Sequence, residues 1–251
     1  MPRALRARTV PVAEVDAATR DAMWRLYEAH YEGVARAVFE RDLAEKRHVV
    51  LARDATGALQ GFSTLTSYRR AHEGRALIVV FSGDTVVAPA HWGDRALQNA
   101  FGRYITRVRL AHPCTPVWWF LVSKGYKTYL LLTRNFPEHW PRHDRETPAW
   151  HRGALDAIAR ERFGGAWDPA AGIVRTHGAS ARVRAGLAPI EEPLLAAPDV
   201  RYFVHANPGH ARGDELACLG RVTAGIWVRY AFRKGLRRRS TAARGRAWAS
   251  S

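Results

Sequence analysis

The stretch that decides the fold is Val86-Val87-Ala88-Pro89-Ala90-His91-Trp92-Gly93-Asp94-Arg95-Ala96-Leu97, where an apolar strand passes through a short turn into a helix. Pro89 ends the strand because proline has no N–H to donate to a sheet ladder. The first amides of the following helix have no partner inside it, so this turn is a candidate phosphate-binding site. The competing interpretation is an ordinary strand-to-helix turn without a ligand, since any α/β protein contains such steps.

The residues before this turn predict two helices and a hairpin that lead into a long strand. Gly33 separates the two helices, and Ser82-Gly83-Asp84 indicates a bulge or a close backbone approach in the long strand. In chain order we expect a strand over 7–12, a helix capped by Asp16 up to about residue 30, a helix up to about residue 46, strands over 48–53 and 59–68, and the long strand over 75–87.

The residues after the turn predict a further mixture of helices and strands. Expected are a helix over 94–110, a buried strand over 117–122, helices over 126–135 and 149–163, strands near 173 and over 201–205, and a last helix from Asp214 to about residue 235. These assignments favour one main domain over 1–206, followed by a helix and a basic tail over 207–251.

Composition excludes several classes of protein. The chain has 251 residues, of which 47% are apolar and 25% charged, as is usual for globular proteins. The longest apolar runs, 76–81 and 117–122, are too short to cross a membrane, and residues 1–16 lack the apolar core of a secretory signal. Cys114 and Cys218 lie far apart and indicate neither a disulfide framework nor a zinc site. We therefore expect a cytoplasmic protein without a transmembrane segment.

The formal net charge of +16 raises the question of an anionic partner. Much of the excess is local, because residues 216–251 contain nine arginines and lysines and no acidic residue. The run Arg233-Lys234-Gly235-Leu236-Arg237-Arg238-Arg239 could engage an acidic carrier protein, nucleic acid or a membrane surface, and a solvated tail is the alternative. No aromatic stacking platform accompanies the run, which disfavours nucleic acid.

The order of elements, with Val87-x-Pro89 and Gly93, resembles the GNAT superfamily of N-acyltransferases over about residues 7–136. In that family a strand ending in V-x-P leads into a turn of pattern Q/R-x-x-G-x-G/A, whose backbone holds the pyrophosphate of coenzyme A. Ala90 and Arg95 depart from this pattern. The resemblance implies an α/β fold with a mixed, splayed central sheet flanked by helices, here with a C-terminal helical extension.

The resemblance also implies site residues. Asp84 would take a proton from the attacking amine, although it could equally be a turn residue that bonds its own backbone. Tyr126 would return a proton to the departing thiolate, with Tyr129 as a second choice, and backbone N–H groups at Val86 or Val87 would polarise the thioester carbonyl. The groups expected to bind the acyl thioester are Val86, Val87, Trp92, Gly93, Asp94, Arg95, Ala96, Leu97, Ser123 and Lys124.

By the same resemblance, the protein transfers an acyl group from acyl-CoA, or from phosphopantetheine on an acidic acyl carrier protein, to an amine of a small molecule or peptide. Trp118, Trp119, Phe120 and Trp140, together with the long C-terminal half, favour an acyl chain longer than acetyl, as in fatty acyl transfer. The alternatives are a GNAT-shaped binding protein without catalysis and a basic nucleic-acid-binding protein.

Other polar groups carry weaker expectations. His139, His143 and His151 resemble a ligand cluster, but Pro141 breaks the helix that would align the first two, so we expect no metal. Glu215 is a reserve base, and its competing interpretation is an acidic residue at a helix N-terminus.

Overall fold

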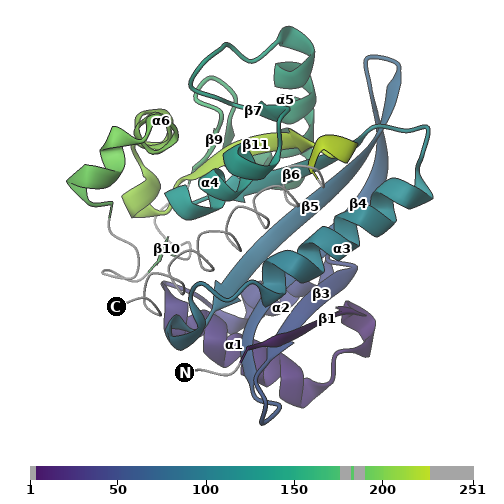
Figure 1. Ribbon diagram of the computed structural model, residues 1–251, viewed down its shortest axis with the longest axis vertical. Coiled ribbons are helices and arrows are strands. Elements are labelled where there is room, and N and C mark those ends of the chain that lie inside the picture. The colour runs from purple at the N-terminus through teal and green to yellow at the C-terminus, as the bar shows by residue number, and fades with distance from the viewer. Residues whose placement is uncertain (1–3, 176–181, 184–189, 227–251) are drawn as a thin grey trace, which may run out of the picture.

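The computed structural model describes residues 4–175, 182–183 and 190–226 of the chain (Figure 1). Its strands are β1 Arg6–Pro11, β2 Tyr31–Glu32, β3 His48–Arg53, β4 Leu59–His72, β5 Arg75–Val87, β6 Val117–Ser123, β7 His139–Trp140, β8 Trp167–Asp168, β9 Ile173–Val174, β10 Arg182–Val183 and β11 Glu215–Arg221. Its α-helices are α1 Ala17–His30, α2 Arg36–Ala44, α3 Ala96–Ala111, α4 Tyr126–Asn135, α5 Ala149–Phe163 and α6 Pro198–Ala206.

One large mixed sheet organises these elements. Its strand order is β1-β3-β4-β5-β6-β11-β9-β8, β7 pairs with β11, and β2 pairs with β10 in a small separate sheet. β5 and β6 run parallel, whereas β4 with β5 and β6 with β11 are antiparallel. In Figure 1, α1 and α2 lie with β1 and β3 at one end of the sheet, and α5 lies at the other. The expected mixed α/β architecture is confirmed.

Alternation along the strands gives the sheet two apolar faces, because successive side chains point to opposite sides. On β5, Ile78 and Val80 pack in one core with α3, α4 and α6. Leu77, Val79 and Phe81 pack in a second core with α5. Helices α1 and α2 build a third core against β3, β4 and the end of β5. The sheet is therefore covered on both sides.

The first helix begins where the sequence predicts. The Asp16 carboxylate accepts a hydrogen bond of 2.6 Å from the Thr19 amide, which satisfies one of the free donors at the helix start. Met23 and Tyr27, four residues apart, are buried on one side of α1. This amphipathic pattern fixes α1 over the β3–β4 hairpin.

The central feature of the sheet is the separation of β5 from β6. Their parallel pairing runs from Ile78 and Val117 to Ser82 and Leu121, and then it stops. Beyond that point the register of β5 against β4 shifts between Ser82 and Thr85, which is the bulge expected from Gly83. The splayed sheet implied by the resemblance is confirmed. We call the space beyond Ser82 and Leu121 the gap.

Two expected elements are wrong. Residues 201–205 belong to α6 instead of a strand, because the segment Pro198–Ala206 starts with a proline and an aspartate that favour a helix. The helix expected from Asp214 is instead strand β11 over its first part, and residues 227–235 lie outside the described residues. Leu216 and Leu219 have helical spacing, but β11 is buried on both faces and so lacks the alternation that identifies most strands. The expected division of the chain into a main domain over 1–206 and an extension over 207–251 stays a prediction.

The position of β11 inside the sheet gives a stability prediction. Leu219 is fully buried, so Leu219→Ala should lower the free energy of unfolding by about 2–5 kcal/mol. Leu110→Ala is the matched control, because Leu110 is 73% exposed, and it should change stability by less than about 0.5 kcal/mol. Urea denaturation followed by circular dichroism measures both values. Equal, small effects would place β11 outside the core.

Candidate functional site

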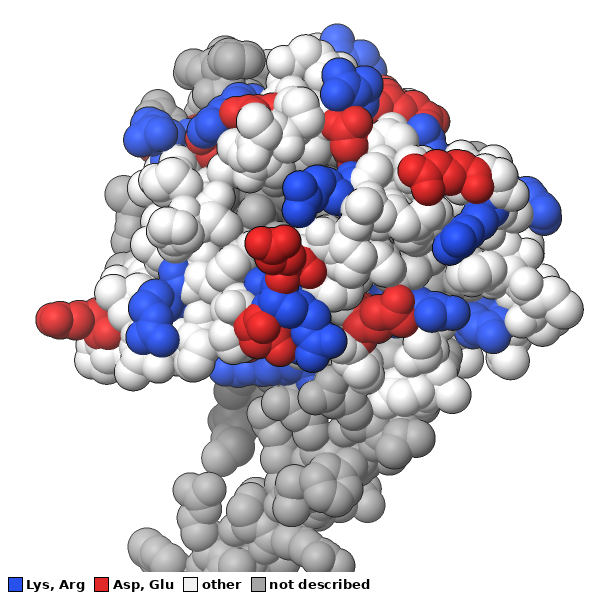
Figure 2. Space-filling view, turned by 90° about the horizontal axis from the view of Figure 1, so that it is seen from above, with Lys and Arg blue, Asp and Glu red and all other residues white. Residues whose placement is uncertain are grey.

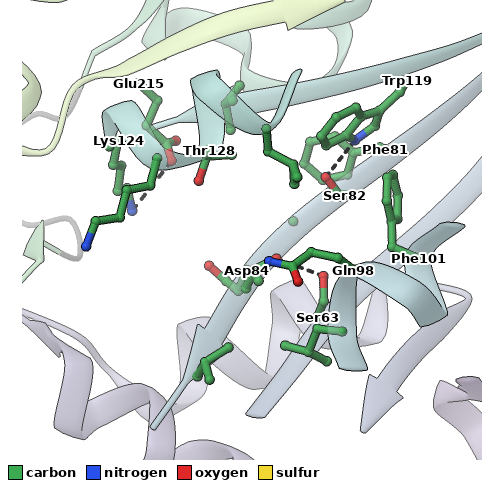
Figure 3. Close-up of a pocket in the computed structure, with 18 of the residues that line it drawn as sticks. Ser63, Phe81, Ser82, Asp84, Gln98, Phe101, Trp119, Lys124, Thr128 and Glu215 are labelled. Atoms are coloured by element: carbon green, nitrogen blue, oxygen red, sulfur yellow. Dashed lines mark hydrogen bonds and ion pairs between the residues drawn. The ribbon is translucent and has the colours of Figure 1, made fainter. Parts of the chain in front are cut away.

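A cavity of about 1770 Å³ opens at the gap. Side chains from β5, α3, α4, α2 and β11 line it, so it reaches both faces of the sheet. Figure 3 shows Asp84 and Ser63 on one side of the cavity and Lys124, Thr128 and Glu215 on the other. The separated strands therefore open a path through the sheet between two sets of polar groups.

Asp84 lies in the bulge of β5 and faces this cavity. Among the described residues, its carboxylate has no hydrogen bond or ion pair. Burial raises its pKa to about 6, and the neighbouring Asp42 carboxylate adds to the increase, while Lys124 and Lys46 oppose it. A carboxylate with this pKa is ionised at neutral pH and still basic enough to accept a proton.

Lys124 and Glu215 form an ion pair on the β6 and β11 side of the gap. The Nζ of Lys124 lies 3.6 Å from Oε1 of Glu215 and 5.2 Å from the centre of the Tyr31 ring. Burial raises the pKa of Glu215, and Lys124 opposes that increase. Burial is the largest effect and disfavours the charged form of Lys124, but Glu215, Tyr31 and Asp84 together outweigh it and raise the pKa of the lysine. The sequence indicates Glu215 only as a reserve base, because its pattern predicts a helix from Asp214 where the structure has strand β11.

A second ion pair lies beside the bulge. Lys46 is 4% exposed, and its Nζ lies 2.6 Å from the Asp42 carboxylate. Gly83 makes room for this lysine, since a Cβ there would lie 3.0 Å from Lys46 Cε and 2.6 Å from Thr64 Oγ1. Nothing in the sequence distinguishes Lys46 from a surface lysine, so sequence reasoning missed it.

The start of α3 is only partly available to a ligand. One oxygen of Asp94 accepts a hydrogen bond of 2.7 Å from the Ala96 amide, and the other accepts one of 3.0 Å from the Leu5 amide. The amides of Leu97 and Gln98 have no acceptor among the described residues. The helix start expected to offer unpaired amides to a phosphate therefore offers only some of them, because the Ala96 amide is already bonded to Asp94.

The residues predicted to bind the acyl thioester separate into two groups. Those that line the cavity are Val87, Gly93, Asp94, Arg95, Leu97 and Lys124. Those that do not are Val86, which is buried in the core; Ala96, whose amide binds Asp94; Ser123, whose hydroxyl donates to Gly125 O; and Trp92, which is 46% exposed.

Trp92 has a structural contact that the sequence did not reveal. Its Nε1 donates to the Val87 carbonyl at 2.9 Å, and Nε2 of His30 lies 2.8 Å from the same oxygen. The Nδ1 of His30 lies 2.8 Å from Leu26 O. The Val87 carbonyl therefore accepts a hydrogen bond from Trp92 and lies in contact with His30, which holds the end of β5.

The two candidate tyrosines on α4 have different surroundings. Tyr126 lines the cavity at the first residue of the helix. Tyr129 is fully buried away from it, and its hydroxyl donates to Pro141 O at 3.0 Å. Geometry favours Tyr126 over Tyr129 as a group that can reach a ligand.

The α3 and α4 side of the cavity is largely apolar. Of the four aromatic residues expected there, only Trp119 lines the cavity, and its Nε1 donates to Ser82 Oγ at 2.8 Å. Trp118, Phe120 and Trp140 pack in the core beneath α5. The apolar lining on the α3 and α4 side consists of Leu97, Phe101, Ile105, Trp119, Leu130, Leu131, Phe136, Leu194 and Ile226.

The histidines considered as metal ligands have separate partners. His139 contacts Phe136 O, His143 contacts Asp199, and His151 contacts Glu138. Within the described part of the chain, no three His, Cys, Asp or Glu side chains are placed to hold a metal ion. No helix in that part is both long and apolar enough to span a bilayer.

Charge is mixed on the face seen in Figure 2, where lysine and arginine side chains stand beside aspartate and glutamate. That face is therefore not a uniform basic surface for a polyanion. The expected basic run over 233–239 lies outside the described residues.

No protein-family profile matches the chain, and no curated protein matches its sequence. Among solved structures, it is similar to a probable N-acyltransferase from Enterococcus faecalis, with 15% identity, a TM-score of 0.39 and coverage of 55% of this chain and 37% of that one. It is also similar to a GNAT family N-acetyltransferase from Escherichia coli in complex with CoA, with 15% identity, a TM-score of 0.36 and coverage of 49% and 66%.

A third similar structure is an acyl-CoA N-acyltransferase from Pseudomonas aeruginosa, with 20% identity, a TM-score of 0.35 and coverage of 47% and 79%. The chain thus spans less than two thirds of the length of the first two proteins. At these identities, the likeness is one of fold.

The raised pKa of Asp84 gives a stability prediction with a definite sign. The unfolded carboxyl ionises near pH 4 and the folded one near pH 6, so ionised Asp84 destabilises the fold as pH rises through this window. Asp84→Asn should therefore stabilise the protein at pH 8 by roughly 1–3 kcal/mol, and the gain should shrink towards pH 4. Urea denaturation at several pH values measures it. A gain independent of pH would contradict the assignment.

Proposed function

We propose that the protein is an N-acyltransferase that moves an acyl group from a thioester to an amine within the gap. The observation that carries this proposal is the unpaired Asp84 carboxylate, exposed to a cavity that passes between separated parallel strands. Such a path lets a thioester approach from one face and an amine from the other. The likeness in fold agrees with this assignment without specifying the substrates.

The α3 side suits a phosphorylated donor such as acyl-CoA. The amides of Leu97 and Gln98, which have no acceptor among the described residues, lie in the first turn of α3, where the helix dipole favours anions. Arg95 and Lys127 are exposed, line the same cavity and supply positive charge. The Asp94 carboxylate opposes a phosphate at this point, so Arg95 would offset it when the donor binds. A phosphopantetheine group on an acidic carrier protein would use the same contacts.

The chemistry follows from the groups at the gap. Asp84 accepts a proton from the amine, the nitrogen attacks the thioester carbonyl, the C–N bond forms and the C–S bond breaks. In an antiparallel pair, successive residues of a strand direct their backbone groups alternately towards and away from the partner strand. The Ala88 amide donates to Gln60 O on β4, so the Val87 amide points away from β4 and faces the gap. There it can polarise the carbonyl of the thioester. Tyr126 supplies a proton to the thiolate.

Removal of the proposed base tests this mechanism. Asp84→Asn should lower kcat/KM for acyl transfer by about 10²–10⁴-fold, because the amine then loses its proton acceptor. Wild-type activity should fall as pH drops through about 6, where the Asp84 carboxylate is protonated. A continuous thiol-release assay with acyl-CoA measures both effects.

The tyrosine assignment has a matched control on the same helix. Tyr126→Phe should lower kcat about tenfold or more, whereas Tyr129→Phe removes only the bond to Pro141 O and should leave kcat unchanged.

An Asp84→Asn variant with full activity would favour a different base. A wild-type protein that binds acyl-CoA without transfer would favour the GNAT-shaped binding protein.

We further propose that the donor carries an acyl chain longer than acetyl, held by the apolar α3 and α4 side of the cavity. Each buried methylene contributes about 0.8 kcal/mol, or roughly fourfold in affinity. KM should therefore fall from acetyl-CoA to octanoyl-CoA. Phe101→Trp narrows the cavity beside Trp119, whose ring lies 4.8 Å from Phe101, and should shift the optimum to shorter chains. Leu110→Trp, on the exposed side of α3, is the control. A KM independent of chain length would exclude this proposal.

A further inference from the structure

Arg162 on α5 is a cation that the reaction above does not use. Its guanidinium carbon lies 3.8 Å from the centre of the Phe81 ring, and its side chain is 15% exposed and lines the cavity. Stacking on an aromatic ring holds a guanidinium in one orientation. Arg162 is therefore a pre-positioned planar donor on the α5 side of the gap.

The donor capacity of Arg162 is mostly unused. Among the described residues, its ion pair is with Glu45, at 3.7 Å, and the Glu45 side chain is 60% exposed. A pair at this distance with an exposed carboxylate contributes little, because water screens the carboxylate. A guanidinium has five N–H donors and binds a carboxylate best through two of them. An anionic group of a ligand could therefore replace Glu45 at low cost.

Arg162 and Asp84 lie on the same side of β5. Phe81 packs towards α5 and Val86 packs towards α1 and α2, so both side chains point to one face of the sheet. The bulge between Ser82 and Thr85 brings Asp84 to that face as well, in agreement with the effect of Asp42 from α2 on its pKa. The three positions from Phe81 to Asp84 span about 10 Å of strand.

This face thus offers a carboxylate at Asp84 and a guanidinium at Phe81, separated by about 10 Å of strand. Asp84 has no partner among the described residues, whereas the ammonium groups of Lys46 and Lys124 are paired with Asp42 and Glu215. An amine with no other charge would satisfy Asp84 alone. A ligand that carries both an amine and an anion would satisfy Asp84 and Arg162 together.

We propose that the acyl acceptor is an amino acid type of molecule, whose carboxylate binds Arg162 while its amine lies at Asp84. This inference rests on the proposed acyl transfer and names the class of its acceptor. Arg162 acts as a specificity-determining residue, because it binds the acceptor away from the reacting atoms. The exposed Glu45 is displaced when the carboxylate enters.

The test is a binding measurement without any acyl donor. Glycine, β-alanine, 4-aminobutanoate and 6-aminohexanoate are compared by calorimetry with the corresponding amides, which keep the shape and the amine but lose the anion. The wild-type protein should bind one or more of these acids at least tenfold more tightly than its amide. The number of carbons between amine and carboxylate in the acid with the largest preference then measures the distance between Asp84 and Arg162.

Variants of Arg162 separate its role from a general effect on the fold. Arg162→Gln should abolish the preference for acid over amide, and Arg162→Lys should keep part of it. Arg160→Gln is the matched control, since Arg160 lies on the same helix, is 61% exposed and pairs with Asp156. Thermal unfolding of each variant verifies that it folds.

Equal affinity of every acid and its amide in the wild type would overturn the proposal, and so would an unchanged preference in a folded Arg162→Gln protein. Because no donor is present, these outcomes are independent of acyl transfer. A protein that shows the Arg162-dependent preference but transfers no acyl group would contradict the proposed function and retain the acceptor assignment.

Discussion

The end of the hydrogen bonding between β5 and β6 is the constraint on which the site depends. Pairing stops at Ser82 and Leu121, where β5 forms a bulge and Lys46 packs against Gly83. A side chain on Gly83 would meet Thr64 and Lys46, so the bulge and the buried lysine need a glycine there. Past this point the facing backbone groups of the two strands lack each other as partners, and a ligand can use them.

The gap persists because each strand is held firmly on its other side. β5 stays paired with β4 as far as Val87, and β6 stays paired with β11 as far as Ser123. His30 and Trp92 also fix the Val87 carbonyl from α1 and from the turn before α3. Both halves of the sheet keep their strand pairing beside the gap, so the space between them is present without a ligand.

The sequence predicts those parts of the fold whose pattern is local. The amphipathic helix α1, the β3–β4 hairpin and the bulge at Gly83 all follow from periodicity and turn residues. β11 was missed because it is buried on both faces, and α6 because its aromatic and β-branched residues are typical of strands. Asp84 could be found from its place near a strand end. Arg162 and Glu215 reach the gap, and Lys46 reaches the bulge, from distant segments, which no local pattern reveals.

Charge is distributed unevenly about the gap, and this gives a direction to the proposed reaction. Helices α3 and α4 contain no Asp or Glu, and Arg95, Arg103, Arg107, Lys127 and Arg134 line their side of the cavity. The carboxylates of Asp42, Asp84 and Glu215 lie at the gap and towards the opposite face, where Arg41, Lys124 and Arg162 also line the cavity. In the proposed reaction, a phosphorylated donor is attracted to the first side, and the carboxylates of the second side attract an ammonium. The bulge at Asp84 lies between the two sides, so the break in the sheet that opens the path is also where the proposed reaction brings nitrogen and thioester together.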